Sequence, residues 1–175
     1  MIGVAGQDQA GYDLEKQVSS LPQVTSYLLT DNSRPTTLKT RYVADGQQLL
    51  RADHEISYPL SPHMEKQISM RVRGAIESCS VLILSDYAKG VLTDSVLKEI
   101  IALANEKGRR VLIDPKGRNF SRYSGAYMLT PNRRELSEST GIPVHTVQEA
   151  EKAARQLISD HDLQGILAKL GADGV

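Results

Sequence analysis

Short apolar runs alternate with segments of helical period along most of this chain. The aliphatic run at residues 81–85 predicts a buried strand, Thr93 precedes a helical pattern that ends at Gly108, and residues 110–114 predict the next strand. Strands separated by helices of this length require crossover connections, which make the strands parallel. The pattern therefore predicts the α/β class, as a three-layer parallel sheet with helices on both faces.

The first residues predict a strand followed by a helix. Residues 1–6 are mostly apolar and lead into a Gly-rich turn. Asp8 is a candidate N-cap, because its carboxylate can accept hydrogen bonds from the free amides of the first turn, and Pro22 ends the helix. Helical spacing predicts three core positions, which are Leu14, Val18 and Leu21.

A β-hairpin is predicted after this first unit. A β-rich run at 24–29 is followed by two strand patterns, at 37–43 and 47–51, that flank Asp45-Gly46. Asp-Gly favours a tight type I′ turn. Side chains alternate along a strand, which brings three cations to one surface: Lys39, Arg41 and Arg51.

The second half of the chain continues the alternation of helices and strands. Helices are predicted to start at Ser61-Pro62, at Asn132 and at Thr146, which has capping-box spacing with Glu149, and short strands at 127–130 and 165–168. The predicted core positions of the first and last of these helices are Met64, Ile68, Val72 and Ile76, and Val147, Ala150, Ala154, Leu157 and Ile158.

Composition narrows the class of protein. The 175 residues carry 21 basic and 21 acidic side chains, so the formal net charge is zero, which argues against a nucleic-acid partner. No apolar run approaches the ~20 residues of a membrane span, and the histidines show no metal-site spacing. We expect one cytoplasmic domain over residues 1–175, with the hairpin as an excursion at about 24–55 and a sheet left incomplete at both ends.

Three polar segments directly follow predicted strands, at residues 85–90, 114–118 and 130–135. Ligands of open parallel sheets bind beyond the carboxyl ends of the strands, so these segments are candidates for one site. Their basic side chains and the free amides of a helix start can offset negative charge. The pattern favours a phosphorylated small molecule as ligand.

Structural interpretations remain open for the same residues. Carboxylates after strands cap turns, loop lysines are often solvated, and an Asn three residues before a Glu has the spacing of a capping box. Standard nucleotide fingerprints are absent, since the chain has neither a Walker loop nor a GxGxxG after its first strand. These alternatives apply to Asp86, Asp114, Lys89, Lys116, Asn132, Glu135, Arg41 and Arg51.

Six segments, taken in order, resemble the ribokinase-like (PfkB) carbohydrate kinases. GQDQAG at 6–11 is similar to the family's GxDxxG segment, and PTTLKTR at 35–41 with QQLLRAD at 47–53 resembles the hairpin of its heptose kinases. More specific still are LSDYAKG at 84–90, IDPKG at 113–117 and LTPN at 129–132. Within the family, the chain is most similar to the heptose 7-phosphate kinase domain of ADP-heptose synthesis.

The resemblance implies ATP-dependent phosphorylation of the anomeric hydroxyl of D-glycero-β-D-manno-heptose 7-phosphate, giving the 1,7-bisphosphate used for lipopolysaccharide. It implies ATP and Mg²⁺ as cofactors, with Glu135 orienting Mg²⁺ through water, and a hairpin lid over the sugar that pairs in a homodimer. The implied ATP and Mg²⁺ contacts are Asn132, Arg133, Arg134, Glu135, Lys116, Gly171 and Gly174, and the implied substrate contacts are Arg41, Arg51, Asp86 and Lys89.

The chain also departs from the family's pattern. Lys169 stands where the family usually has a Thr, and both an upstream sugar-binding motif and a downstream GAGD motif with the general base are absent. We therefore expect an internal fragment, with the base beyond Val175 and little activity alone. The alternatives are a non-catalytic sugar-phosphate or nucleotide-binding paralogue and a Rossmann-type oxidoreductase, whose dinucleotide loop the chain lacks.

Overall fold

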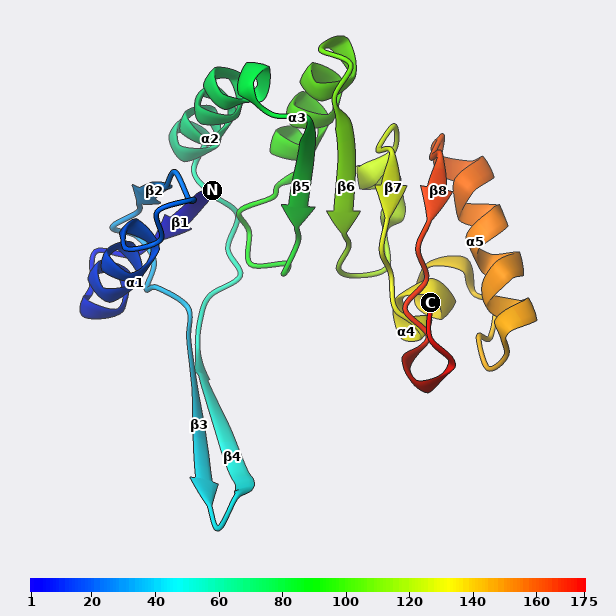
Figure 1. Ribbon diagram of the computed structural model, residues 1–175, viewed down its shortest axis with the longest axis horizontal. Helices are drawn as coiled ribbons and strands as arrows, with labels where there is room; N and C mark the ends of the chain where they lie inside the picture. The colour runs from blue at the N-terminus through cyan, green and yellow to red at the C-terminus, as the bar shows by residue number, and fades with distance from the viewer. The chain divides into compact units, whose positions relative to one another are not determined.

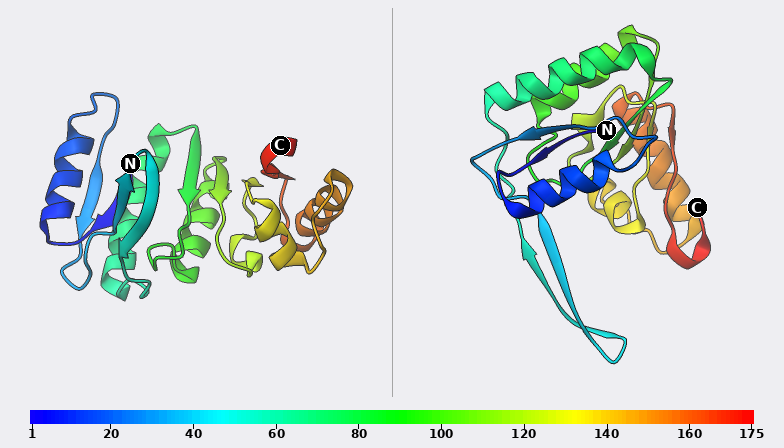
Figure 2. Two further views of the ribbon diagram at one scale, coloured as in Figure 1. Left: turned by 90° about the horizontal axis from the view of Figure 1, so that it is seen from below. Right: turned by 60° about the vertical axis from the view of Figure 1, so that its left-hand side comes forward.

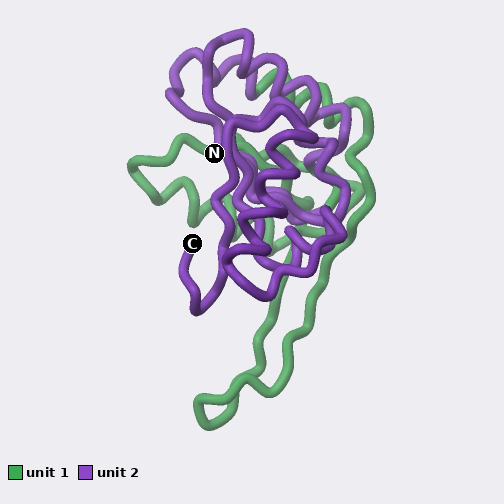
Figure 3. Tube along the Cα trace, turned by 90° about the vertical axis from the view of Figure 1, so that its right-hand side faces the viewer, with its two compact units in different colours: residues 1–71, 89–91 green, residues 72–88, 92–175 purple.

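The computed structural model describes residues 1–175, which fall into two compact units. Unit 1 contains residues 1–71 and 89–91, and unit 2 contains residues 72–88 and 92–175 (Figure 3). The boundary between them lies within helix α2 (Pro62–Ala75). Each unit has its own parallel strands, so the polar segments that follow strands are divided between the two.

Unit 1 opens with a parallel β-α-β arrangement. Strand β1 (Ile2–Ala5) pairs with β2 (Tyr27–Thr30), and α1 (Gln9–Ser19) connects them. The helix ends before Pro22, as predicted. Leu21 was wrongly predicted as a core position: it lies beyond the helix end, in a turn, and is 51% exposed. Because of this turn, β2 begins at Tyr27, three residues after the start of the predicted run at 24–29.

Asp8 joins α1 to the segment that leads into the hairpin. One carboxylate oxygen accepts from the Gly11 amide at 2.8 Å, which confirms the predicted cap, and the other accepts from the Thr36 amide at 2.7 Å. Next to Asp8, the backbone of Gly6 lies so close to that of Arg34 that only glycine fits, since a Cβ at Gly6 would lie 2.4 Å from the Arg34 carbonyl oxygen. The GxDxxG segment therefore anchors the chain where the hairpin begins.

The hairpin consists of β3 (Leu38–Ala44) and β4 (Gln47–His54), paired antiparallel as predicted. Asp45 and Gly46 both have positive φ, 51° and 77°, which is the conformation that a type I′ turn requires. The two strands extend away from β1, β2 and α1 of the same unit (Figures 1 and 2). Both faces of the hairpin are largely exposed to solvent.

Arg34 holds the segments at the other end of the hairpin. Its Nε lies 3.0 Å from Asp31 Oδ2, and its two Nη atoms donate to the carbonyl oxygens of Lys89, at 3.1 Å, and Tyr58, at 2.9 Å. Gly90 packs so tightly here that a Cβ would lie 1.8 Å from the Tyr58 carbonyl oxygen. The guanidinium group thus ties three separate segments of unit 1 together.

Unit 2 is built on a four-stranded parallel sheet in the order β5-β6-β7-β8 (Figure 1). One face is buried: Leu84, Ile113 and Leu129 lie side by side in register and are at most 6% exposed. The opposite face of β5 carries Ile83, which is 66% exposed. The strands are β5 (Val81–Ser85), β6 (Arg110–Asp114), β7 (Met128–Leu129) and β8 (Gly165–Ile166).

Three helices connect these strands, namely α3 (Asp94–Glu106), α4 (Arg133–Thr140) and α5 (Val147–His161). The predicted caps at their starts are confirmed. The predicted core of α5 is wrong in part, because Val147 in its first turn is 51% exposed and Ala153 is buried rather than Ala154. All the helices are too short or too polar to cross a lipid bilayer.

The Asp8 clamp, in which one carboxylate accepts from the amides of Gly11 and Thr36, predicts that the stability of the fold depends on pH. Hydrogen bonds from Thr36 and Gly11 hold the pKa of Asp8 below its ordinary value of 3.8. Because the pKa of Asp8 is lower in the folded state, the ionised carboxylate stabilises the fold. This stabilisation is fully present above pH 3.8 and is lost as the pH falls through the lowered, folded-state pKa. We expect Asp8→Asn to lower the melting temperature at pH 7 and to differ less from wild type at pH 3.

Thermal unfolding followed by circular dichroism checks this prediction. Asp13→Asn is a matched control, because Asp13 lies on the same helix and accepts only from the Gln9 side chain, at 2.8 Å. An Asp8→Asn deficit of equal size at both pH values would contradict the clamp.

Candidate functional site

The polar loops of unit 2 meet at the carboxyl edge of its sheet. Parallel strands end at the same edge, so the residues after β5, β6, β7 and β8 are brought together there (Figure 1). The side chains that converge near this edge come from residues far apart in the sequence: Asp86, Asp114, Lys116, Thr130, Asn132, Glu135 and Lys169.

Glu135 links Lys116 to the start of α4. One carboxylate oxygen lies 3.0 Å from Lys116 Nζ, and the other accepts from the Asn132 amide at 2.9 Å. The Asn132 side chain in turn accepts from the Glu135 amide at 2.9 Å, which completes the predicted capping box. The Glu135 side chain is 8% exposed and that of Lys116 is 52% exposed. The capping box and the ion pair therefore share one buried carboxylate and present one accessible ammonium.

The start of α4 also offers backbone donors. Asn132 accepts from the Glu135 amide, while Arg133 and Arg134 occupy the first two helical positions, where a helix supplies no acceptor for the amides. Amides at a helix start, together with the helix dipole, attract anions. With the Lys116 ammonium beside them, they make an arrangement suited to phosphoryl oxygens.

A second ammonium reaches the same edge. Lys169 Nζ lies 2.6 Å from Asp114 Oδ1, which also accepts from the Thr130 hydroxyl at 3.2 Å. Lys169 pairs with Asn132 in an isolated parallel bridge, which brings it beside the start of α4. Its side chain is 42% exposed. Lys169 thus adds a partly neutralised cation to this edge.

Asp86 lies at the edge of the same sheet but is buried, at 6% exposure. Its oxygens accept from the Tyr123 hydroxyl at 2.7 Å and from the Ala88 amide at 2.7 Å, and the Arg122 guanidinium lies 3.5 Å away. An internal hydrogen-bonded role is therefore what the geometry supports for Asp86. Tyr123 has no place among the sequence predictions, because a tyrosine in a loop carries no spacing that points to it.

Arg133 and Arg134 are not brought to the Lys116–Glu135 pair. The Arg133 guanidinium donates to the carbonyl oxygens of Leu170 and His145, each at 3.0 Å, and pairs with Asp173. Arg134 faces solvent and pairs with Glu138 one helical turn on, at 2.6 Å. Neighbouring positions on a helix point in different directions, which separates these two side chains from Glu135.

Gly171 and Gly174 lie in the turn that Arg133 holds. Both have positive φ, 69° and 83°, and the Gly174 carbonyl oxygen accepts from the Leu170 amide at 2.8 Å. Their side-chain-free backbone lies at the exposed surface. The structure thus connects these glycines to the start of α4 through Arg133.

The predicted substrate residues Arg41, Arg51 and Lys89 all belong to unit 1. Arg41 and Arg51 are directly opposed across the hairpin, and Arg51 Nε lies 2.8 Å from Asp53. Lys89 Nζ lies 2.6 Å from Glu55. Like charges in opposed positions destabilise a hairpin, and Asp53 offsets this repulsion on the Arg51 side only.

Asp53 and Glu55 are acidic partners of these cations that the sequence analysis missed. Lys39 lies 2.9 Å from Asp53 and 3.1 Å from Glu55, and it joins the two carboxylates. Hydrogen bonds from Lys39 and Arg51 lower the pKa of Asp53, and those from Lys89 and Lys39 lower the pKa of Glu55. Alternation along the strand could have found them, since 51, 53 and 55 share one face.

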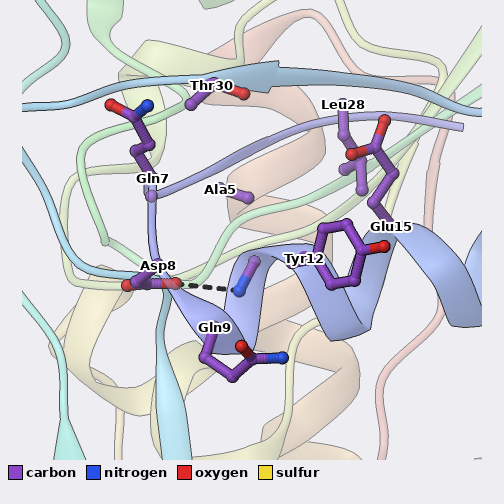
Figure 4. A pocket seen from close by; sticks show the side chains of 10 residues that line it. Ala5, Gln7, Asp8, Gln9, Tyr12, Glu15, Leu28 and Thr30 are labelled. Carbon is purple, nitrogen blue, oxygen red and sulfur yellow. Dashed lines mark hydrogen bonds between the residues drawn. The ribbon is translucent and has the colours of Figure 1, made fainter.

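A separate cavity of about 490 Å³ lies within unit 1 (Figure 4). It contains two carboxylates and no lysine or arginine, so it does not favour an anionic ligand. The Asp8 bond to the Gly11 amide lies among its lining residues (Figure 4). Its lining residues are Ala5, Gly6, Gln7, Asp8, Gln9, Gly11, Tyr12, Glu15, Leu28 and Thr30.

Residues 1–175 match a family model described as pfkB family carbohydrate kinase. The bifunctional protein HldE of Rhodospirillum rubrum is 41% identical over 174 residues, which cover 99% of this chain and 35% of that protein. The chain thus spans about a third of the length of this curated relative.

Two solved structures share the fold. Phosphofructokinase-2 from Escherichia coli in complex with potassium gives a TM-score of 0.75 at 20% identity, over 97% of this chain and 55% of that one. A ribokinase from Arabidopsis thaliana complexed with ribose and ATP gives 0.70 at 19% identity, over 98% and 55%. The predicted ribokinase-like α/β fold is confirmed, and the chain spans just over half of these structures.

Because Glu135 pairs with Lys116, we expect substitutions of these two residues to have coupled effects on the free energy of unfolding. Lys116→Met retains most of the aliphatic stem and leaves Glu135 without its cation, so we expect the free energy of unfolding to fall by about 1 kcal/mol. Glu135→Gln removes the same attraction from the other side. The double variant should therefore lose less than the sum of the two single losses.

Urea denaturation measures these losses. Arg134→Met serves as the control, because it breaks an exposed pair on the same helix and should cost less than Lys116→Met. Strictly additive losses for Lys116 and Glu135 would show that the pair does not contribute to stability.

Proposed function

This chain belongs to the pfkB family of carbohydrate kinases, and we propose that it forms the nucleotide-binding edge and the lid of an ATP-dependent sugar kinase. We further propose that the acceptor is D-glycero-β-D-manno-heptose 7-phosphate, phosphorylated at its anomeric hydroxyl to the 1,7-bisphosphate. The convergence of Lys116, Asn132 and Glu135 at one sheet edge carries the proposal. The similarity to HldE over nearly the whole chain supports the choice of a heptose.

The sheet edge of unit 2 would hold the nucleotide. In this proposal the Lys116 ammonium and the first amides of α4 bind phosphoryl oxygens. Phosphoryl transfer depends chiefly on positioning and charge neutralisation, which such donors supply. Lys169 adds a second ammonium beside Asn132. Arg133, Gly171 and Gly174 support the site by holding the neighbouring turn.

The donor set fits a magnesium ion carried on the nucleotide. Mg²⁺ commonly binds through one or two carboxylates together with substrate phosphates and retained waters. Glu135 provides one such carboxylate, and the structure contains no cluster of three or more His, Cys, Asp or Glu residues for a resident metal. When bound, the ion would neutralise charge on the phosphoryl oxygens. Glu135 would orient its water shell while remaining paired with Lys116.

The hairpin would contact the sugar phosphate. Arg41 makes no ion pair in the structure and faces Arg51 across the hairpin, so a phosphate group would relieve the repulsion between them. Lys89 and Lys39 extend this positive surface, balanced by Asp53 and Glu55. Asp86 is left out of the substrate contacts, because its carboxylate is buried and already hydrogen-bonded.

Titration calorimetry with MgATP tests the nucleotide half of the proposal. Lys116→Met removes a charged contact to a phosphoryl oxygen and should weaken MgATP binding about tenfold. Lys107→Met is a matched control, because Lys107 is also a partly exposed, ion-paired lysine of unit 2, with its Nζ 2.8 Å from Glu77. The control should bind MgATP as wild type does, and equal losses in both variants would contradict the assignment.

Release of ADP on addition of heptose 7-phosphate, measured in the protein that carries this chain, tests the reaction itself. Turnover that depends on this sugar supports the kinase. Binding of MgATP without turnover on any sugar phosphate would favour the alternative of a non-catalytic binding paralogue.

We also propose that the hairpin pairs with a second copy of this chain. Tyr42 and Leu50 are opposed across the strands and are 52% and 53% exposed, and Leu38 on the same face is 49% exposed. The other face carries the charged Lys39 and Arg41. An amphipathic hairpin with a bare apolar face favours burial against a like surface.

Sedimentation velocity tests this pairing. Tyr42→Asp places a charge on the apolar face and should convert a dimer to a monomer at micromolar concentration. Gln48→Asp near the hairpin tip adds the same charge on the other face, because Gln48 is opposed to Val43, and should leave the dimer intact. A monomeric wild type would refute the pairing.

A further inference from the structure

The buried hydroxyl of Tyr123 connects the loops that follow β5 and β6. Tyr123 is 0% exposed, and its oxygen lies 2.7 Å from Asp86 Oδ2 and 3.2 Å from the amide nitrogen of Lys116. Its ring packs edge-on against Phe120, with the ring centroids 5.8 Å apart. All three linked residues belong to unit 2.

The geometry fixes the direction of these hydrogen bonds. A hydroxyl has one proton, and the Asp86 oxygen at 2.7 Å is a nearer and more strongly charged acceptor than the Lys116 carbonyl oxygen at 3.2 Å. Tyr123 therefore donates to Asp86 and accepts from the Lys116 amide. Burial, and then the hydrogen bond to Asp86, raise the pKa of Tyr123, so the hydroxyl keeps its proton throughout the neutral range.

Asp86 is held firmly enough to orient this hydroxyl. Its second oxygen accepts from the Ala88 amide at 2.7 Å, in a tight turn where Ala88 has a φ of 53°. The guanidinium of Arg122 lies 3.5 Å from the oxygen that binds Tyr123. The carboxylate thus has protein partners on both oxygens.

The Lys116 backbone needs such an anchor. Its side chain is 52% exposed, and Gly117, which follows it, has a φ of 89° that leaves this turn with little steric constraint of its own. Pro115 on the other side is fully buried. Together with the buried Pro115, the hydrogen bond from the Lys116 amide to Tyr123 fixes the main chain from which the lysine side chain extends.

We propose that Tyr123 is a positioning residue, whose hydroxyl, oriented by Asp86, holds the Lys116 main chain so that the ammonium group meets Glu135 and a nucleotide phosphate. This inference rests on the nucleotide half of the proposed function. Tyr123 is fully buried, so its side chain is not available to contact a ligand at the sheet edge. Its effect must therefore pass entirely through Lys116, which makes the two residues energetically coupled.

Tyr123→Phe removes only the hydroxyl, and Tyr127→Phe is its matched control. Tyr127 lies four residues away in the same unit, and its ring lies 4.7 Å from the Arg110 guanidinium while its hydroxyl makes no hydrogen bond. We expect Tyr123→Phe to raise the MgATP dissociation constant about fivefold to tenfold, and the control to leave it unchanged. In the Lys116→Met background, the Tyr123→Phe change should have no further effect.

Amide hydrogen exchange without nucleotide gives an independent readout. Tyr123→Phe should speed exchange at the Lys116 amide about tenfold, while the Leu136 amide inside α4 exchanges as in wild type. Should Tyr123→Phe fold poorly, Asp86→Asn replaces it, because the amide cannot satisfy both Tyr123 and Ala88 as a carboxylate does.

The outcomes separate this inference from the proposed function. If wild type does not bind MgATP, the nucleotide assignment fails, while the exchange measurement still reports on the Tyr123 anchor. If wild type binds and Tyr123→Phe binds equally well, the positioning role is wrong. The role is also wrong if the Tyr123 and Lys116 losses simply add.

Discussion

The carboxylate of Glu135 is the group on which the candidate site depends. It caps its own helix through the Asn132 amide, and it holds the Lys116 ammonium, which comes from the loop after a different strand. A buried carboxylate needs a cation and hydrogen-bond donors, and both are supplied here by elements that parallel pairing brings to one edge. The structural and functional interpretations of Glu135 are therefore compatible, because one oxygen serves each.

In the hairpin, different residues anchor the base and neutralise the charge along the strands. Asp8 and Arg34 anchor the two segments at its base, and Asp53 and Glu55 neutralise most of the cations along one face. The other face carries the exposed Leu38, Tyr42 and Leu50. A two-stranded ribbon is marginally stable without further packing, so these anchors, the charge network and the proposed pairing with a second copy serve the same need.

Individual residues show how far sequence reasoning reached at the site. The Asn132–Glu135 box was predictable, because capping depends on a spacing of three residues. Arg133 and Arg134 lie between them in the sequence but point elsewhere, since successive helix positions differ by about 100° in direction. The sequence could not decide whether Asp86 contacts a ligand or an internal hydrogen-bond partner, because the burial of Asp86 depends on which residues pack over its loop.

Local order followed from neighbouring residues: the Asp45-Gly46 turn, the helix caps and the alternation of strands and helices depend on contacts within a few positions. The contacts at the candidate site, in contrast, depend on the tertiary structure. Tyr123 meets Asp86 across a separation of 37 residues, and Lys169 meets Asp114 across 55. No spacing in the chain encodes such pairs, because the order and register of the strands determine which loop ends become neighbours.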